Sequence, residues 1–287
     1  NLISEDARTA AIVVFAKEHP EDYDYRQKLL HKTESILEEH KETEFHLAGW
    51  TVTNLRLSEY MQKDLATFIP LTYILIGLVI FVFFRNLRLT ILAVVTISAC
   101  LASTMGLFHI LDIRINNVTT IVPPLVMALA LADVVHIFSH MQSKVLEKYP
   151  DKQNALAHVL NQVSLPCLLT TLTTAIGFFS LVVSDLEPIR QFAYLAAAGM
   201  IFEFFFAFFF LPPLLLFFDP IIIYTKISEK SGMHKILNST TALVQNHSTK
   251  LVVLGCLLIC IAVWSALRID VETNVVEYFK ENTQVRR

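Results

Sequence analysis

One acidic residue, Asp133, lies inside an otherwise apolar stretch of the chain, within VMALALADVVHIFSHM, Val126 to Met141. An ionised carboxylate at the centre of a bilayer costs roughly 2.5–3.5 kcal/mol on insertion scales, so such a residue faces a protein interior or a water-filled path. Burial favours the neutral carboxyl group, whereas a nearby cation or hydrogen-bond donor favours the ionised form. Asp133 is therefore a candidate proton-coupled site. The alternative is a buried acid that joins helices through hydrogen bonds to hydroxyl groups.

Other polar residues in apolar segments could complete such a site. His136 follows Asp133 by three residues, about 60° away around a helix, and is either a second relay member or a core histidine. Thr171 and Thr174 share one face of a later segment, where their hydroxyls either form a wire to the acid or bond within their own helix. Glu203 is a second intramembrane acid that could join the relay, line a substrate path or lie near the interface.

The composition indicates a multispanning membrane protein. The 287 residues are 54% hydrophobic and 17% charged, with a mean hydropathy of +0.53, whereas about 25% of the residues in a soluble domain are charged. The net charge of −3 argues against nucleic acid as a partner. The four cysteines lack disulfide or zinc-ligand spacing, and the seven glycines form no phosphate-binding loop. We expect no cofactor or metal, and an ion gradient rather than a nucleotide as the energy source.

The hydropathy pattern divides the chain into five parts. Residues 1–64 alternate in the manner of a small extracytoplasmic α/β domain piece, with strands at 10–16 and 44–48 around a helix at 23–40. The other parts are a five-helix membrane core (65–218), a cytoplasmic linker or interfacial helix (219–250), a sixth span (251–267) and a polar tail (268–287). The core spans are expected at 65–84, 89–111, 118–141, 163–183 and 189–218. The predicted fold class is an α-helical multispanning membrane protein with a small α+β domain piece.

The distribution of basic residues predicts the orientation. The loops after the first, third and fifth spans carry nine Lys and Arg residues: Arg85, Arg88, Lys144, Lys148, Lys152, Lys226, Lys230, Lys235 and Lys250. The loops on the other side carry two, Arg114 and Arg190. Because basic residues are retained in the cytoplasm, residues 1–64 and 268–287 are both expected outside.

Three segments together resemble the RND superfamily, and most closely its MMPL-type predicted exporters. They are LALADVVHIFSH, the threonine-rich stretch from Leu165 to Met200 with its Pro-Ile-Arg turn, and FFFLPPLLL from Phe208 to Leu216. The tail from Arg268 to Arg287 resembles the segment that opens each of the two outer domains in that family. The five-helix core also resembles the sterol-sensing domain. Since the family has twelve spans in two repeated halves, the resemblance implies that this chain is a piece of a longer polypeptide.

The resemblance implies a proton-driven exporter of hydrophobic or lipid-like molecules in the bacterial inner membrane, with its outer domains in the periplasm. Asp133 matches the position of the family's relay acid. The expected partners are membrane lipids, the substrate, protons and the remaining half of the same polypeptide, with a homo-oligomer or a periplasmic adaptor as further options. Two other functions stay open, a sterol- or lipid-sensing module and a Sec-type accessory to protein translocation. Neither the residues nor the resemblance indicates an enzyme.

Overall fold

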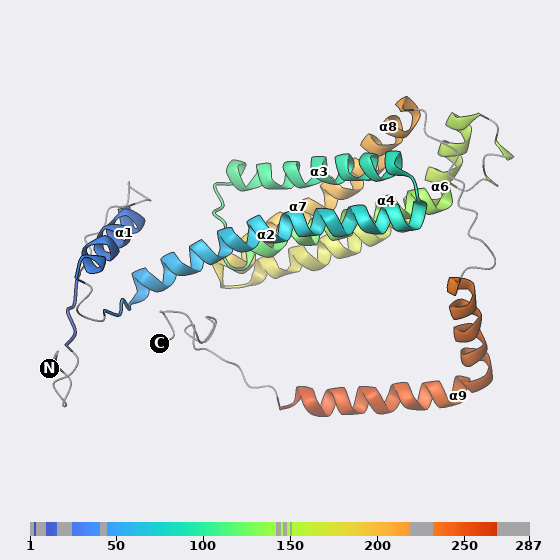
Figure 1. The fold of residues 1–287 in the computed structure, drawn as a ribbon. Helices are drawn as coiled ribbons and strands as arrows, with labels where there is room; N and C mark the ends of the chain where they lie inside the picture. The colour runs from blue at the N-terminus through green and yellow to red at the C-terminus, as the bar shows by residue number, and fades with distance from the viewer. Residues whose placement is uncertain are drawn as a thin grey trace. The chain divides into compact units, whose positions relative to one another are not determined.

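The helices that cross the membrane account for most of the described chain. The computed structural model describes residues 3, 10–15, 25–40, 45–141, 145, 148–149, 151–218 and 232–268. Its helices (Figure 1) are α1 (Tyr25–Glu38), α2 (Trp50–Phe84), α3 (Leu87–Ile110), η1 (Thr119–Ile121), α4 (Val122–His140), α6 (Lys152–Phe179), η2 (Ser180–Val183), α7 (Glu187–Phe205), η3 (Phe206–Phe210), α8 (Leu211–Phe217) and α9 (Gly232–Ala266).

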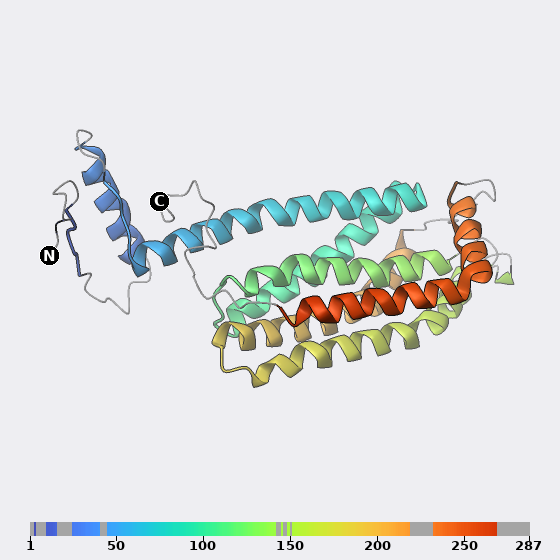
Figure 2. The same cartoon turned by 90° about the horizontal axis from the view of Figure 1, so that it is seen from below.

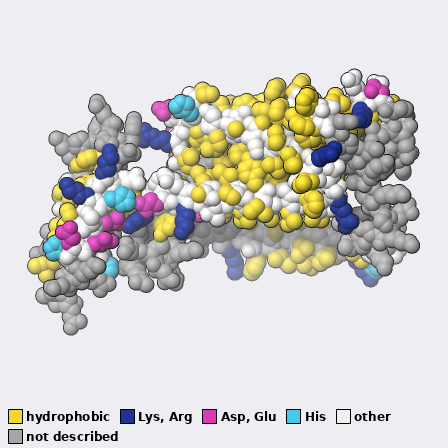
Figure 3. Space-filling view, turned by 45° about the horizontal axis from the view of Figure 1, so that its top comes forward, with side chains coloured by type: hydrophobic (Ala, Val, Ile, Leu, Met, Phe, Trp, Pro, Cys, Tyr) yellow, Lys and Arg dark blue, Asp and Glu magenta, His cyan; other side chains and the backbone are white. Residues whose placement is uncertain are grey.

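Among the described residues, six helical segments are long and apolar enough to span a bilayer, as the sequence predicts. They are Thr51–Phe84, Leu87–Ile110, Thr119–His140, Lys152–Val183, Glu187–Phe217 and Leu243–Ala266. About 20 helical residues cross the hydrocarbon layer of a membrane, and each segment has at least 22 residues. On the bundle, apolar side chains cover the middle of the surface, and Lys and Arg side chains gather towards its ends (Figure 3). This distribution is the one that a lipid environment requires.

The chain divides into two compact units, Asn1–Gln62 with Thr273–Arg287, and Lys63–Glu272. In the first unit, Arg56 at the start of α2 forms ion pairs with Glu34 of α1 and with Glu59. The α/β prediction for residues 1–64 is not supported. The described part of residues 10–16 makes one isolated bridge, between Ile3 and Ala10, and residues 45–48 form no strand. A strand requires a ladder of partners, and the described residues here provide a single bridge.

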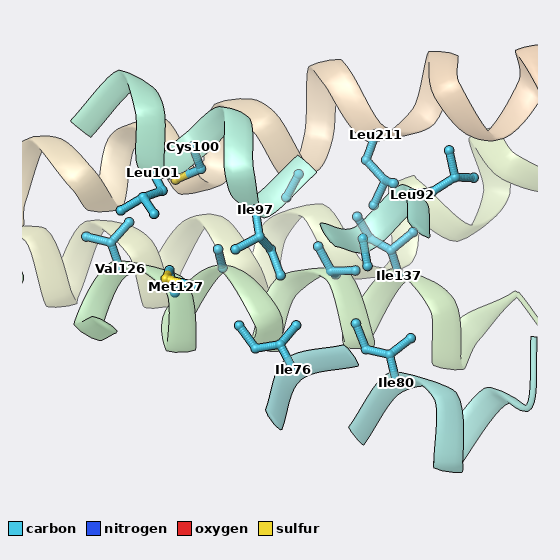
Figure 4. Close-up of a cluster of buried hydrophobic side chains, with 14 of the residues drawn as sticks. Ile76, Ile80, Leu92, Ile97, Cys100, Leu101, Val126, Met127, Ile137 and Leu211 are labelled. Atoms are coloured by element: carbon cyan, nitrogen blue, oxygen red, sulfur yellow. The ribbon is translucent and has the colours of Figure 1, made fainter. Parts of the chain in front are cut away.

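The second unit is a helical bundle in which α3, α4, α6 and α7 pack side by side (Figures 1 and 2). Their shared core receives Ile76 and Ile80 from α2, which point towards α4 in Figure 4. Further core residues include Leu92, Ile97, Cys100 and Leu101 of α3, Val126, Met127 and Ile137 of α4, and Leu211 of α8. These side chains bury the apolar faces that the helices direct at one another and so fix their relative positions.

Two asparagine side chains stabilise turns between spans through hydrogen bonds. Arg85 turns the chain after α2 with a positive φ of 47°, and Asn86 caps α3 by accepting hydrogen bonds from the next turn's N–H groups. Asn116 accepts the N–H groups of Val118 and Thr119 before α4. Its Nδ2 also donates to Gln191 Oε1 of α7 at 2.9 Å. This side-chain bond ties the beginning of α4 to the beginning of α7.

Two proline pairs in the spans have different effects on their helices. Pro123 and Pro124 lie in the first turn of α4, where the missing N–H groups have no helical partner to lose. Pro212 and Pro213 follow the π-helical segment η3, in which the Leu211 N–H donates to the Phe206 carbonyl. Since proline has no N–H, the carbonyls one turn before this pair lose their α-helical donors, and the helix widens there.

The segment after the core contains a longer helix than the separate linker and span that the sequence predicts. Helix α9 runs from Gly232 to Ala266 and contains a non-helical residue, His247, with φ −133° and ψ 29°. The portion before His247 corresponds to the predicted interfacial helix, and the portion after it to the sixth span. Residues 219–231 of the predicted linker, and most of the tail at 268–287, lie outside the described residues.

Candidate functional site

The two intramembrane acids meet in the interior of the bundle. Asp133 projects from α4 and is 7% exposed, and Glu203 projects from α7 and is 2% exposed. The two carboxyl groups lie close enough to interact electrostatically. One oxygen of each, Asp133 Oδ2 and Glu203 Oε1, is buried without a hydrogen-bond partner among the described residues. The structure therefore brings together two acids that lie 70 residues apart in the sequence (203 − 133).

Local sequence explains why each acid faces inward. Around Asp133, the residues at helical spacing, Ala130 and Ile137, are both buried in the core. Around Glu203, Met200 and Ala207 are likewise buried. Because residues three and four apart share a helix face, each acid lies on the apolar stripe that its helix buries. Helix packing therefore carries both carboxyl groups into the interior.

Among the predicted threonines, Thr171 reaches the acid pair. It lies on α6, is 4% exposed, and its hydroxyl interacts with the Glu203 carboxyl. Thr174 is half-buried one turn later. Thr170 and Thr173, which lie on the exposed face, donate to carbonyls of their own helix at 2.8 Å. The threonine-rich segment thus divides into one hydroxyl at the site and two that bond back to the helix.

Cys167 is a neighbour of the site that the sequence analysis did not include among the site residues. Its thiol is buried and interacts with the Asp133 carboxyl. It precedes Thr171 by four residues and so lies on the same face of α6. That spacing was the available signal, because any buried side chain one turn from Thr171 approaches the same acids.

His136 and His140 lie away from the acid pair. Both are exposed on α4, and His140 Nδ1 is 3.0 Å from the His136 carbonyl oxygen. Asp133 and His136 share a helix but occupy its buried and exposed sides, respectively. Within the described residues, no group of three or more His, Cys, Asp and Glu side chains could hold a metal ion.

The arrangement is suited to holding a single proton. Two carboxylates in contact repel each other, and a bilayer interior screens that repulsion poorly, so the pair is stable when one group is protonated. A hydrogen bond between two carboxyl groups also requires one of them to carry the proton. The Thr171 hydroxyl can donate to whichever Glu203 oxygen bears charge.

Comparison with known proteins gives one finding about the family. The model of the MMPL family matches residues 1–234, which include the first five spans and both acids of the pair. No curated protein matches the chain.

Proposed function

Because the chain belongs to the MMPL family, whose members are RND-type transporters rather than enzymes, we propose that it forms part of a proton-driven exporter of hydrophobic or lipid-like molecules. In this proposal the protein acts in the bacterial inner membrane, and its outer domains lie in the periplasm. The Asp133–Glu203 pair takes up a proton from outside and releases it to the cytoplasm. The remaining half of the same polypeptide completes the path.

The observation that carries the proposal is the buried carboxyl pair with its two unpartnered oxygens. An acid that served only to join helices would have its oxygens satisfied by hydroxyl or N–H donors. Here each carboxyl keeps one oxygen without a donor. Binding a proton therefore lowers the electrostatic free energy of the pair, and losing the proton raises it. A group of this kind changes the relative free energy of helix arrangements with each protonation.

The aromatic residues near the second acid support an apolar substrate. Phe205 and Phe209 are 51% and 63% exposed on the bundle surface, and their rings stack with centroids 5.3 Å apart. They follow Glu203 on the same stretch of chain. An exposed aromatic pair of this kind provides a contact surface for acyl chains or for flat apolar groups. This surface lies next to the proposed relay.

The proposal is tested with the full-length protein in vesicles of phosphatidylethanolamine and phosphatidylglycerol. Proton entry under an imposed pH gradient is followed with a pH-sensitive dye trapped inside. Asp133→Asn and Glu203→Gln keep the size and polarity of each side chain but cannot ionise, so each should abolish proton entry. Asp185→Asn, in the exposed turn before α7, is the matched control and should behave as wild type. Wild-type proton entry in Asp133→Asn would refute the proposed coupling.

The same vesicles test the exported substrate class. Movement of a fluorescent phospholipid analogue between leaflets is measured with and without the pH gradient. We expect gradient-dependent movement in the wild type and none in Asp133→Asn. Gradient-dependent proton entry without analogue movement would retain the proton coupling but contradict the lipid-like substrate.

A further inference from the structure

At Gly199, α7 packs closely against α4 and α3. A Cβ atom added there would lie 2.6 Å from Val126 Cγ2 on α4 and 3.4 Å from Thr104 Cγ2 on α3. Carbon atoms in contact prefer a separation of about 3.5–4.0 Å. Glycine also weakens a helix interior relative to alanine. A glycine at this position is therefore explained by packing, because any side chain would force α7 and α4 apart by about 1 Å.

This contact lies one turn from Glu203 on α7 and two turns from Asp133 on α4. Gly199 precedes Glu203 by four residues, so the two share a face of α7 about 6 Å apart along the axis. Val126, labelled in Figure 4, precedes Asp133 by seven residues, which is close to two full turns of α4. On α3, Thr104 donates its hydroxyl to the Cys100 carbonyl at 2.9 Å. The Cys100 side chain is buried, and its thiol interacts electrostatically with Glu203.

We propose that Gly199 is a positioning residue of the proton relay, and that its contact with Val126 holds α7 close enough to α4 for Asp133 and Glu203 to share one proton. The inference rests on the proposed function. Its physical basis is that neither carboxyl is held by a full set of hydrogen bonds. The separation of the two acids is therefore set by the packing of their helices, and the Gly199 contact is a close part of that packing.

The other glycines in the bundle provide a matched control. A Cβ at Gly177 of α6, or at Gly106 of α3, would meet nothing within 4 Å. Gly177→Ala adds the same methyl group to a membrane helix and the same gain in helix propensity, without a collision. It separates the effect of the Gly199 contact from any general effect of replacing glycine in a spanning helix.

The test compares four forms of the full-length protein in the vesicle assay of proton entry: wild type, Gly199→Ala, Gly177→Ala, and the double variant Gly199→Ala/Val126→Ala. Displacing reacting groups by about 1 Å can cost about 100-fold in rate, so we expect a loss of that order in Gly199→Ala. Gly177→Ala should retain wild-type entry. The double variant removes the colliding methyl groups of Val126 and should recover most of the lost rate.

A second readout separates positioning from mere loss of structure. The infrared C=O stretching band of protonated carboxyl groups is followed against pH in each variant, with Asp133→Asn to assign the band. In the wild type the coupled pair should lose its protons in two separated steps. In Gly199→Ala the steps should move together, because acids that no longer interact titrate independently. The double variant should restore the separation.

The outcomes distinguish this inference from the function on which it rests. Wild-type entry and an unchanged titration in Gly199→Ala, with entry abolished in Asp133→Asn, would overturn the positioning role and leave the relay intact. Failure of Val126→Ala to rescue a defective Gly199→Ala protein would also overturn it. Wild-type entry in Asp133→Asn would overturn the relay itself.

Discussion

Replacing both acids by apolar residues should make the bundle more stable while it abolishes transport. Leucine has the same number of heavy atoms as aspartate, and methionine has one fewer than glutamate, so Asp133→Leu/Glu203→Met changes polarity with little change in size. Two buried oxygens without partners disappear in the double variant. Each costs about 1–3 kcal/mol, and the polar contact between the two carboxyl groups that is lost contributes only about 1 kcal/mol. The net expectation is a gain of about 1–5 kcal/mol, of the same order as gains from replacing buried ion pairs.

The single variants should not show this gain. Removing one acid leaves the other without the group that shares its proton, and an unpaired buried polar group carries its full desolvation penalty. The double-mutant cycle should therefore give a double variant that is more stable than either single variant. This non-additivity is the specific signature of two acids in contact.

The unfolding can be measured through the two cysteines of the core. Cys100 and Cys167 are buried, and Cys256 and Cys260 are exposed on α9. With the exposed pair changed to serine, a thiol-reactive dye reports opening of the bundle during heating in detergent. A gain in stability should raise the midpoint by about 2–4 °C for each kcal/mol. A double variant that unfolds at a lower temperature than both single variants would refute the reasoning.

Three further predictions concern orientation and the neighbours of the acid pair. Impermeant thiol reagents applied outside intact cells should modify cysteines placed in residues 1–60 but not one placed at Lys148, and labelling at Lys148 would overturn the topology. Thr171→Val should move the pH of half-maximal proton entry upward, because it removes a donor that stabilises the ionised carboxylate; Thr174→Val, at a half-buried position, should not. His136→Gln should weaken proton entry without abolishing it, because His136 lies on the exposed side of α4. Complete loss would show that His136 is an essential member of the relay.

The membrane spans could be predicted from the sequence because each is a single run of apolar residues. Their bounds were harder to predict, since helical hydrogen bonding continues beyond the hydrocarbon layer. Helix α6 begins at Lys152, whereas its apolar run begins near residue 163. The strands expected at 10–16 and 44–48 had suitable alternation, but a strand depends on partners elsewhere in the chain. Alternation alone carries no information about whether those partners are present.

Both acids could be singled out from the sequence, but their pairing could not. Asp133 stood out because a lone acid in an apolar run is costly, and Glu203 stood out for the same reason. Which acid faces which depends on the axial and rotational register of α4 against α7, and this register is set by contacts such as Gly199 with Val126. His136 shows the opposite limit. A residue about 60° from Asp133 around the helix can lie on the buried side or on the exposed side. Only the packing of the neighbouring helices decides which.

Glu203 is therefore held between two features of α7 that constrain it differently. One turn before it, Gly199 allows contact with α4 and leaves no space for a side chain. Three residues after it, the π-helical segment Phe206–Phe210 begins, followed by prolines that cannot donate backbone hydrogen bonds. The acid is thus close-packed on one side and next to a loosened backbone on the other. Because the acids are paired by helix position, any change that moves α7 alters their proton affinity. By linkage, a change in their protonation must favour one helix position over another.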